Sequence, residues 1–210
     1  LGGRRVSDQR FRGTLLGGPG TAVPPTATLT GAERVGLTQG RYFDAAYNRK
    51  LFWAASQAAT TWSVALATTH TGFVISNPAN SQVNLSPLLA SFALSVAPAG
   101  IAHISLFSGW TAGGITAHTT PLDVLSTYLN DGGGGVGKAD GAATLVGTPR
   151  YGLPIMGGFT AGALHGTSPS LLDLGGAFLV PPGGYFGLAA LTAVIGFAGI
   201  VWEEIPILQS

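Results

Sequence analysis

The sequence predicts an all-β protein, built as an antiparallel β-sandwich with an extended N-terminal arm. Three observations predict it: short apolar runs with period two, Gly- and Pro-rich turns about every 8–12 residues, and few charges. Only 9% of the 210 residues are charged, whereas a typical soluble domain has about 25%. A chain that uses hydroxyls, amides and glycine in place of charged side chains is expected to have little solvent-exposed surface. We therefore expect both faces of its sheets to be covered, by its own second sheet or by identical neighbours.

The stretch from Leu51 to Leu122 contains no Asp, Glu, Lys or Arg. Polar residues, Gly and Pro interrupt it every few residues, while a membrane helix needs about 20 nearly continuous apolar residues. Even the most apolar segment, Leu188 to Trp202, has only fifteen residues. We therefore expect no membrane partner. The net charge of +1 also argues against a nucleic-acid partner, which would require a broad basic stripe.

Residues 1–40 are expected to form the arm, and residues 41–210 the sandwich domain. Gly17 to Gly20 and Pro24-Pro25 interrupt any periodic element in this first segment. No apolar run follows the first two arginines, so we expect no signal peptide. Eight of the ten Lys and Arg residues lie in the first fifty. An asymmetric basic end favours either a docking arm or a solvated, mobile terminus. The arginines that would dock are Arg4, Arg5, Arg10 and Arg12.

Strand patterns begin after residue 41 and are separated by turn residues. The expected strands of this half are Leu51 to Trp53, Thr61 to Leu66, Gly72 to Asn77, Val83 to Val96 and Ile101 to Trp110. Turns are expected at Asn77 to Ser81 and at Pro98 to Gly100. Because proline cannot donate to a ladder, Pro87 is expected at an edge or a bulge. This order is typical of hairpins in a sandwich or barrel.

The middle of the chain has a weaker pattern. Pro121 to Leu129 is the best helix candidate, because three leucines fall on one helical face and Thr120 could cap it. Asp131 to Gly137 is expected to be a flexible surface loop, since it holds five glycines. The loop superficially resembles a phosphate-binding loop, but Ala139 stands where that motif needs a hydroxyl for Mg²⁺.

The last third returns to strands. Those expected are Thr144 to Gly147, Gly158 to Ala163, Ala177 to Val180, Tyr185 to Ala190 and Ala193 to Trp202, with a turn at Pro181 to Gly184. The final strand is apolar on both faces, so we expect it in the sandwich core or against a neighbouring subunit. Its expected self-association residues are Ile195, Phe197, Val201 and Trp202.

The sequence offers little enzyme chemistry. There is no cysteine, which excludes disulfides, thiolate ligands and a Cys nucleophile. The four histidines (His70, His103, His118 and His165) are not spaced as metal ligands, and His103 falls in a strand pattern typical of core. The adjacent Glu203 and Glu204 would point to opposite faces of a strand and cannot form a dyad. They are expected to mark the water boundary. We expect no enzyme activity, no cofactor and no metal.

Two stretches carry a resemblance to a known class of proteins. G-F-V-I-S-N-P-A-N-S-Q-V-N-L-S-P-L-L-A-S-F-A-L-S begins at Gly72, and the ending contains P-P-G-G-Y-F-G-L-A-A and I-V-W-E-E-I-P-I. Together these resemble small virion proteins of tailed bacteriophages, over roughly residues 50–207 of the chain. The resemblance implies a jelly-roll (TNF-like) sandwich, a homotrimer, and a place on a capsid or tail.

The leading hypothesis is therefore a non-enzymatic virion structural protein. It would serve as capsid decoration, cement or accessory protein, associating with itself and docking on a major capsid or other virion protein through its arm. The main alternative is a tail or receptor-binding carbohydrate-recognition module (an adhesin). Trp53, Trp62, Trp110 and Trp202 could then stack on sugars, although aromatic residues in sandwiches more often fill the core. An envelope-associated β protein is the third hypothesis, and an enzyme the fourth.

Overall fold

The structure is a computed structural model that describes residues 26–27, 33–34, 41–62, 66, 69–129, 134–147, 149–159, 170–190 and 192–207. The chain divides into two units, Leu1–Arg41 and Tyr42–Ser210. The first contains two short antiparallel strands, β1 (Thr26–Ala27) and β2 (Glu33–Arg34). Arg4, Arg5, Arg10 and Arg12, the expected docking residues of the arm, lie outside the described residues.

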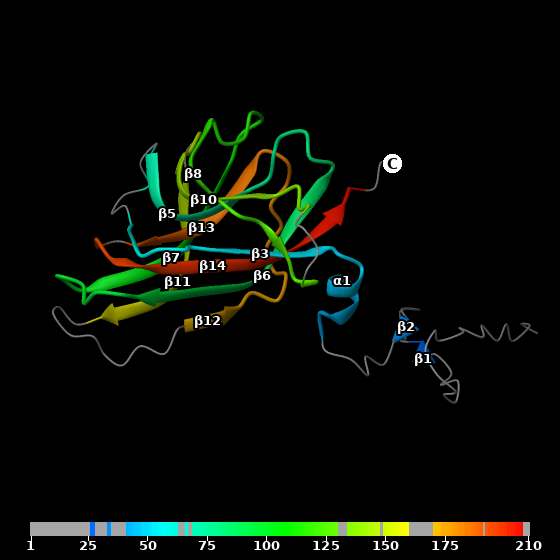
Figure 1. The fold of residues 1–210 in the computed structure, drawn as a ribbon, viewed down its shortest axis with the longest axis horizontal. Helices are drawn as coiled ribbons and strands as arrows, with labels where there is room; N and C mark the ends of the chain where they lie inside the picture. Colours follow the sequence, from blue (N-terminus) through cyan, green and yellow to red (C-terminus); the bar gives the residue numbers. More distant parts are fainter. Residues whose placement is uncertain are drawn as a thin grey trace, which may run out of the picture. The chain divides into compact units, whose positions relative to one another are not determined.

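The second unit is a sandwich of two antiparallel six-stranded sheets (Figure 1). The first, here the β13 sheet, has the order β11 (Arg150–Phe159), β7 (Ala102–Trp110), β13 (Gly184–Ala190), β5 (Thr69–Ser76), β10 (Lys138–Thr144) and β8 (Ala117–Leu122). The second, here the β14 sheet, has the order β12 (Ser170–Asp173), β6 (Val83–Leu94), β14 (Ile195–Pro206), β3 (Leu51–Ala55) and β9 (Leu125–Ser126), with β4 (Thr60–Thr61) also paired to β14. The all-β sandwich prediction is confirmed.

The expected hairpin order is wrong. β5, β6 and β7 follow one another in the chain, but β6 belongs to the β14 sheet and its two neighbours to the β13 sheet. Pro98 to Gly100 therefore carries the chain from one sheet to the other. Within the described part of the sandwich, no strand is hydrogen-bonded to the strand that follows it in the chain. The apolar pattern gives the strands but does not say which sheet each one joins.

The expected helix at Pro121 to Leu129 is also wrong. Pro121 and Leu122 end β8, where they pair with Asp140 and Ala139, and Leu125 and Ser126 form β9. Pro121 is tolerated because β8 is the edge strand of its sheet. The helix that is present, α1 (Phe43–Tyr47), has five residues and precedes β3. No described helix is long and apolar enough to cross a membrane.

The core lies between the two sheets and is filled by alternate residues of their strands. Its largest fully buried side chains include Trp62, Trp202, Phe73, Ile104 and Leu188. The expected irregularity at Pro87 is present, since the pairing of β6 with β14 shifts register where Pro87 faces Trp202. The two expected turns at Asn77 and Pro181 also fall between strands.

The turn before β13 is a type II turn. The Gly184 N–H donates to the Pro181 carbonyl at 2.8 Å, with Pro182 at the second position. Gly183 has φ 81°, which a type II turn needs at its third position. The buried side-chain amide of Asn77 holds the loop before β13 against the start of β6. Its Nδ2 donates to the carbonyls of Val83 (2.8 Å) and Val180 (2.9 Å).

Candidate interaction surfaces

The outer faces of the two sheets differ in what covers them. Every residue of β13 is buried, because on its outer face Tyr185 and Ala189 join a second apolar cluster that the chain itself covers. Leu66 and Ile115 pack against that cluster. The β14 sheet has the same kind of inner face, but its outer face remains partly exposed.

An apolar row crosses the outer face of the β14 sheet. Val201 of β14 lies between Leu89 of β6 and Trp53 of β3, and Trp53 in turn pairs with Leu125 of β9. Leu125 and Phe197 are each 39% exposed. Phe197 lies opposite Ala93 of β6. This row, together with Phe197, is called the open face below.

The expected self-association residues separate between the two sides of β14. Ile195 and Val201 are partly exposed and Phe197 is exposed, so these three could contact another molecule. Trp202 is 0% exposed and packs in the core near Phe52, with 6.4 Å between ring centroids. Trp202 therefore offers no surface to a second copy. The alternation of the final strand was visible in the sequence, but not which side faces inward.

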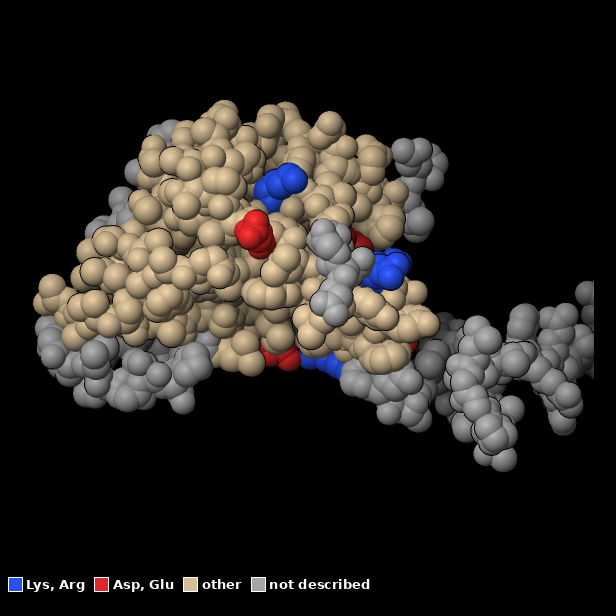
Figure 2. Space-filling model, in the orientation of Figure 1, with Lys and Arg blue, Asp and Glu red and all other residues tan. Residues whose placement is uncertain are grey.

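Charged side chains are few on the surface, as Figure 2 shows for one side of the molecule. In this view the blue groups lie close to red ones, and wide uncharged areas surround them. Among the described residues, no group of three or more His, Cys, Asp or Glu could hold a metal ion.

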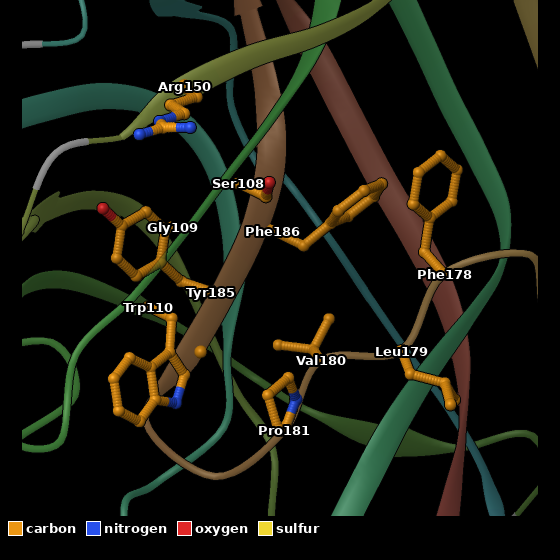
Figure 3. A pocket seen from close by; sticks show the side chains of 11 residues that line it. Ser108, Gly109, Trp110, Arg150, Phe178, Leu179, Val180, Pro181, Tyr185 and Phe186 are labelled. Carbon is orange, nitrogen blue, oxygen red and sulfur yellow. The ribbon is translucent and has the colours of Figure 1, made fainter.

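A shallow pocket of about 500 Å³ opens at one end of the sandwich (Figure 3). The ends of β7 and β13, the start of β11 and the loop before β13 line it. Trp110 is 58% exposed there, and its indole N–H donates to the Pro182 carbonyl at 2.8 Å. Trp53 is half-buried on the open face, while Trp62 and Trp202 are core. The four tryptophans do not form one platform.

The glycine-rich loop contributes an internal anion site. The backbone N–H groups of Val136 (3.0 Å) and Gly137 (2.8 Å) donate to the two carboxylate oxygens of Glu204. Glu204 is buried, so it does not mark a water boundary as expected, whereas Glu203 is partly exposed. Residues 130–133 of the loop lie outside the described residues. The amides that a phosphate-binding loop would offer to a ligand are here used by the protein's own carboxylate.

A histidine–aspartate pair joins β8 to β10. His118 Nδ1 lies 2.7 Å from Asp140 Oδ2, and the Asp140 side chain is fully buried. Burial raises the pKa of Asp140, and His118 opposes that rise through its hydrogen bond and charge. The other oxygen of Asp140 has no hydrogen-bond partner among the described residues. Sequence spacing did not reveal this pair, because 22 residues separate its members.

His70 is a fully buried histidine on β5, and its ring is tilted against that of Phe107 with the centroids 4.6 Å apart. Burial lowers its pKa to about 4, with a smaller opposing effect from the backbone of Leu188. Neither ring nitrogen has a hydrogen bond of good geometry among the described residues. The expected core histidine, His103, is instead exposed, and His165 lies outside the described residues.

The chain matches no protein-family model, and comparisons with curated proteins and with solved structures found no relative.

Proposed function

We propose that the chain is a non-enzymatic structural subunit of a virion, a capsid decoration or accessory protein that associates with copies of itself. The open face of the β14 sheet is the observation that carries this proposal. The central strands of one sheet are covered on their outer side by the chain itself, while the other sheet leaves Val201, Trp53 and Phe197 at least partly exposed. A second copy would complete the burial that the first sheet achieves alone.

The strand order supports a jelly-roll (TNF-like) type, as the resemblance to phage virion proteins implies. A jelly roll has eight strands in two sheets formed by two Greek keys. Here β3-β14-β6-β12 and β5-β13-β7-β11 form two such four-stranded sheets, and among these eight strands the chain changes sheet at every step except from β7 to β11. β8, β9 and β10 are then an insertion between the fourth and fifth strands, which widens both sheets.

The charge distribution supports a permanent rather than transient association. Obligate interfaces are the most hydrophobic class and bury several thousand Å². At roughly 25 cal/mol per Å² of apolar surface, such an interface contributes strongly even after the cost of association. We propose a homotrimer held through Ile195, Phe197 and Val201 with the row beside them.

Light scattering of the purified protein at micromolar concentration tests this proposal. We expect a mass three times that of the chain. Phe197→Glu places a charge on the open face and should yield a folded monomer. The matched control is Ile101→Glu, because Ile101 is also an exposed apolar residue, at 63%, but it precedes β7 of the other sheet. A wild-type monomer, or equal loss of mass in both variants, would contradict the open face as the interface.

The basic arm supports docking on a second virion protein. We propose that Arg4, Arg5, Arg10 and Arg12 contact an acidic surface of a major capsid or other virion protein. Reversing all four to Glu should weaken attachment to particles stripped of this chain, while the mass of the free protein stays unchanged. Attachment that survives the reversal would exclude this role.

A second candidate function is carbohydrate recognition by the same sandwich, as in an adhesin. The exposed Trp110 ring in the shallow pocket favours it. Binding of a glycan on an array, lost in Trp110→Ala, would support this candidate.

A further inference from the structure

We propose that the pocket at the end of β7 and β13 binds an acidic saccharide, one whose ring carries a carboxylate. This inference rests on the second candidate function and names the ligand class for it. It is independent of the assembly role, because the pocket and the open face share no residue.

The pocket is built from fixed parts. The indole N–H of Trp110 is held by Pro182, which belongs to the type II turn. Tyr185 also lines the pocket, and its hydroxyl donates to the Val146 carbonyl at 2.9 Å. Because Gly109 has no side chain, the Tyr185 ring can occupy the space beside it. A ring held in place before the ligand arrives loses little conformational freedom on binding.

The lining offers one flat apolar surface and one cation. Trp110 presents an exposed aromatic ring, which can cover the apolar face of a sugar. Phe178 and Phe186 lie together with ring centroids 5.3 Å apart and form an apolar wall. Among the described lining residues, Arg150 brings the single positive charge, and none of them is Asp or Glu. The chemistry therefore favours a ring with one negative charge.

Arg150 is available to a ligand. Its side chain is exposed, and among the described residues its guanidinium forms no hydrogen bond or ion pair. A guanidinium presents a planar fork of donors that matches a carboxylate at two points. Ser108, which is also exposed, adds a hydroxyl that can donate or accept.

The strand register sets the spacing between these groups. Arg150 of β11 lies directly opposite Ser108 of β7, and Trp110 follows two residues later on the same side of β7. Two residues of a strand span about 7 Å and neighbouring strands lie about 5 Å apart, so the backbones of Arg150 and Trp110 are separated by roughly 8–9 Å, a distance suited to one sugar residue and its carboxylate. In Figure 3 the Arg150 and Trp110 side chains lie on the same side of the pocket, with the two phenylalanines opposite.

A phosphate-bearing ligand fits less well. Phosphate groups carry more charge and are usually held by several donors, such as a helix N-terminus, a backbone nest or more than one cation. The part of the pocket lining that the structure describes contains one Arg and no Lys. A nucleotide would therefore leave much of its charge without a partner.

The test compares two sugars that differ only in the carboxylate. Methyl β-glucuronide and methyl β-glucoside are titrated into the full chain, and binding is followed by the NMR signal of the Trp110 indole N–H. We expect the glucuronide to bind about tenfold more tightly, as one charged hydrogen-bonded contact implies. Adenosine monophosphate serves as the phosphate-bearing comparison and should bind more weakly than the glucuronide.

Two variants locate the site. Arg150→Gln should bring the glucuronide to the affinity of the glucoside, and Trp110→Ala should weaken both. The controls are Lys138→Gln, an exposed cation outside the pocket, and Leu153→Ala, an exposed apolar residue outside it. Neither control should change binding, and circular dichroism verifies that each variant folds.

The outcomes separate the two levels of the proposal. Equal affinity for the two sugars, both lost in Trp110→Ala, would overturn the acidic class while carbohydrate recognition stands. If neither sugar binds, both the acidic ligand class and carbohydrate recognition by this pocket are overturned. Tighter binding of adenosine monophosphate would overturn the saccharide in favour of a nucleotide.

Discussion

At the scale of single residues, the most consequential polar groups are buried and lie far apart in the sequence. Glu204 accepts two backbone N–H groups of a loop 67 and 68 residues away. Asp140 meets His118, and His70 is enclosed without a partner among the described residues. In a chain with so few charges, each of these groups has a measurable effect on stability.

Replacing Glu204 with Gln is expected to destabilise the fold by about 1–3 kcal/mol, because a single amide oxygen cannot serve both N–H groups and an amide NH₂ would face a donor. Urea unfolding measures the change. Glu203→Gln is the matched control, since Glu203 is partly exposed. Its free energy of unfolding should stay within about 0.5 kcal/mol of the wild type. Equal effects of the two substitutions would contradict the loop anchor.

His70 is expected to make the protein less stable in acid. Its pKa is 6.5 when unperturbed and about 4 in the fold, so between these values the unfolded state binds more protons. Stability from this residue is complete above pH 6.5 and is lost as pH falls toward 4, by about 3 kcal/mol.

Unfolding measured across that range checks the His70 prediction. His70→Leu should flatten the profile between pH 6.5 and 4 without loss of stability at pH 7, because no hydrogen bond is removed. The raised pKa of Asp140 acts in the opposite sense, lowering stability as that carboxyl ionises. The comparison is therefore between wild type and variant. If the stability of His70→Leu falls between pH 6.5 and 4 as much as that of the wild type, His70 does not cause the loss of stability in acid.

At the scale of elements, local signals were readable from the sequence and long-range ones were not. The turns at Asn77 and Pro181 depend on residues within four positions, and the bulge at Pro87 follows from a missing N–H. The sheet that each strand joins depends on partners up to about 150 residues away, as for Glu203 and Leu51, so the sequence wrongly predicts a hairpin for β6 and β7. Leu122 and Leu125 suit a helical face equally well, and only pairing with β10 and β3 decides for strands.

The candidate sites follow the same rule. That Phe197 and Val201 share one face of the strand could be predicted because strand alternation is local, while the inward direction of Trp202 depends on the packed sheets. Trp110 was one tryptophan among four, and its exposure depends on the end of β7 lying open. Arg150, which lines the same pocket, is 40 residues away from Trp110 in the sequence, and no spacing rule connects the two residues.

Gly183→Ala tests the type II turn. A side chain there would have to adopt φ 81° and would overlap the Thr111 carbonyl. The expected loss is about 1–3 kcal/mol in thermal or urea unfolding. Gly113→Ala is the control, because a Cβ at Gly113 meets nothing within 4 Å. If both variants lose the same stability, the turn geometry is not the cause.

At the scale of the whole molecule, the two sheets differ in what covers their outer faces. The chain itself covers the outer side of the central strands of the β13 sheet, whereas the outer face of the β14 sheet stays partly exposed. Under the proposed assembly role this face is the interface between copies, and the low charge of the chain is consistent with that role.

Self-association is therefore expected to resist salt. The Debye length falls from about 10 Å at 0.1 M to about 3 Å at 1 M ionic strength, which weakens contacts between exposed charges but not apolar burial. The mass from light scattering should remain constant between these concentrations. Docking through the four arginines should weaken over the same range. Dissociation of the free protein into monomers at 1 M would contradict an apolar interface.

The outermost strands of the β14 sheet have a further consequence. β12 has four residues and β9 only two, so neither flank offers a long row of unpaired amides and carbonyls to an incoming strand. Short flanks of this kind discourage amyloid-like growth by lateral strand addition. In the part of the chain that the structure describes, the β14 sheet is therefore a poor template for growth along either flank.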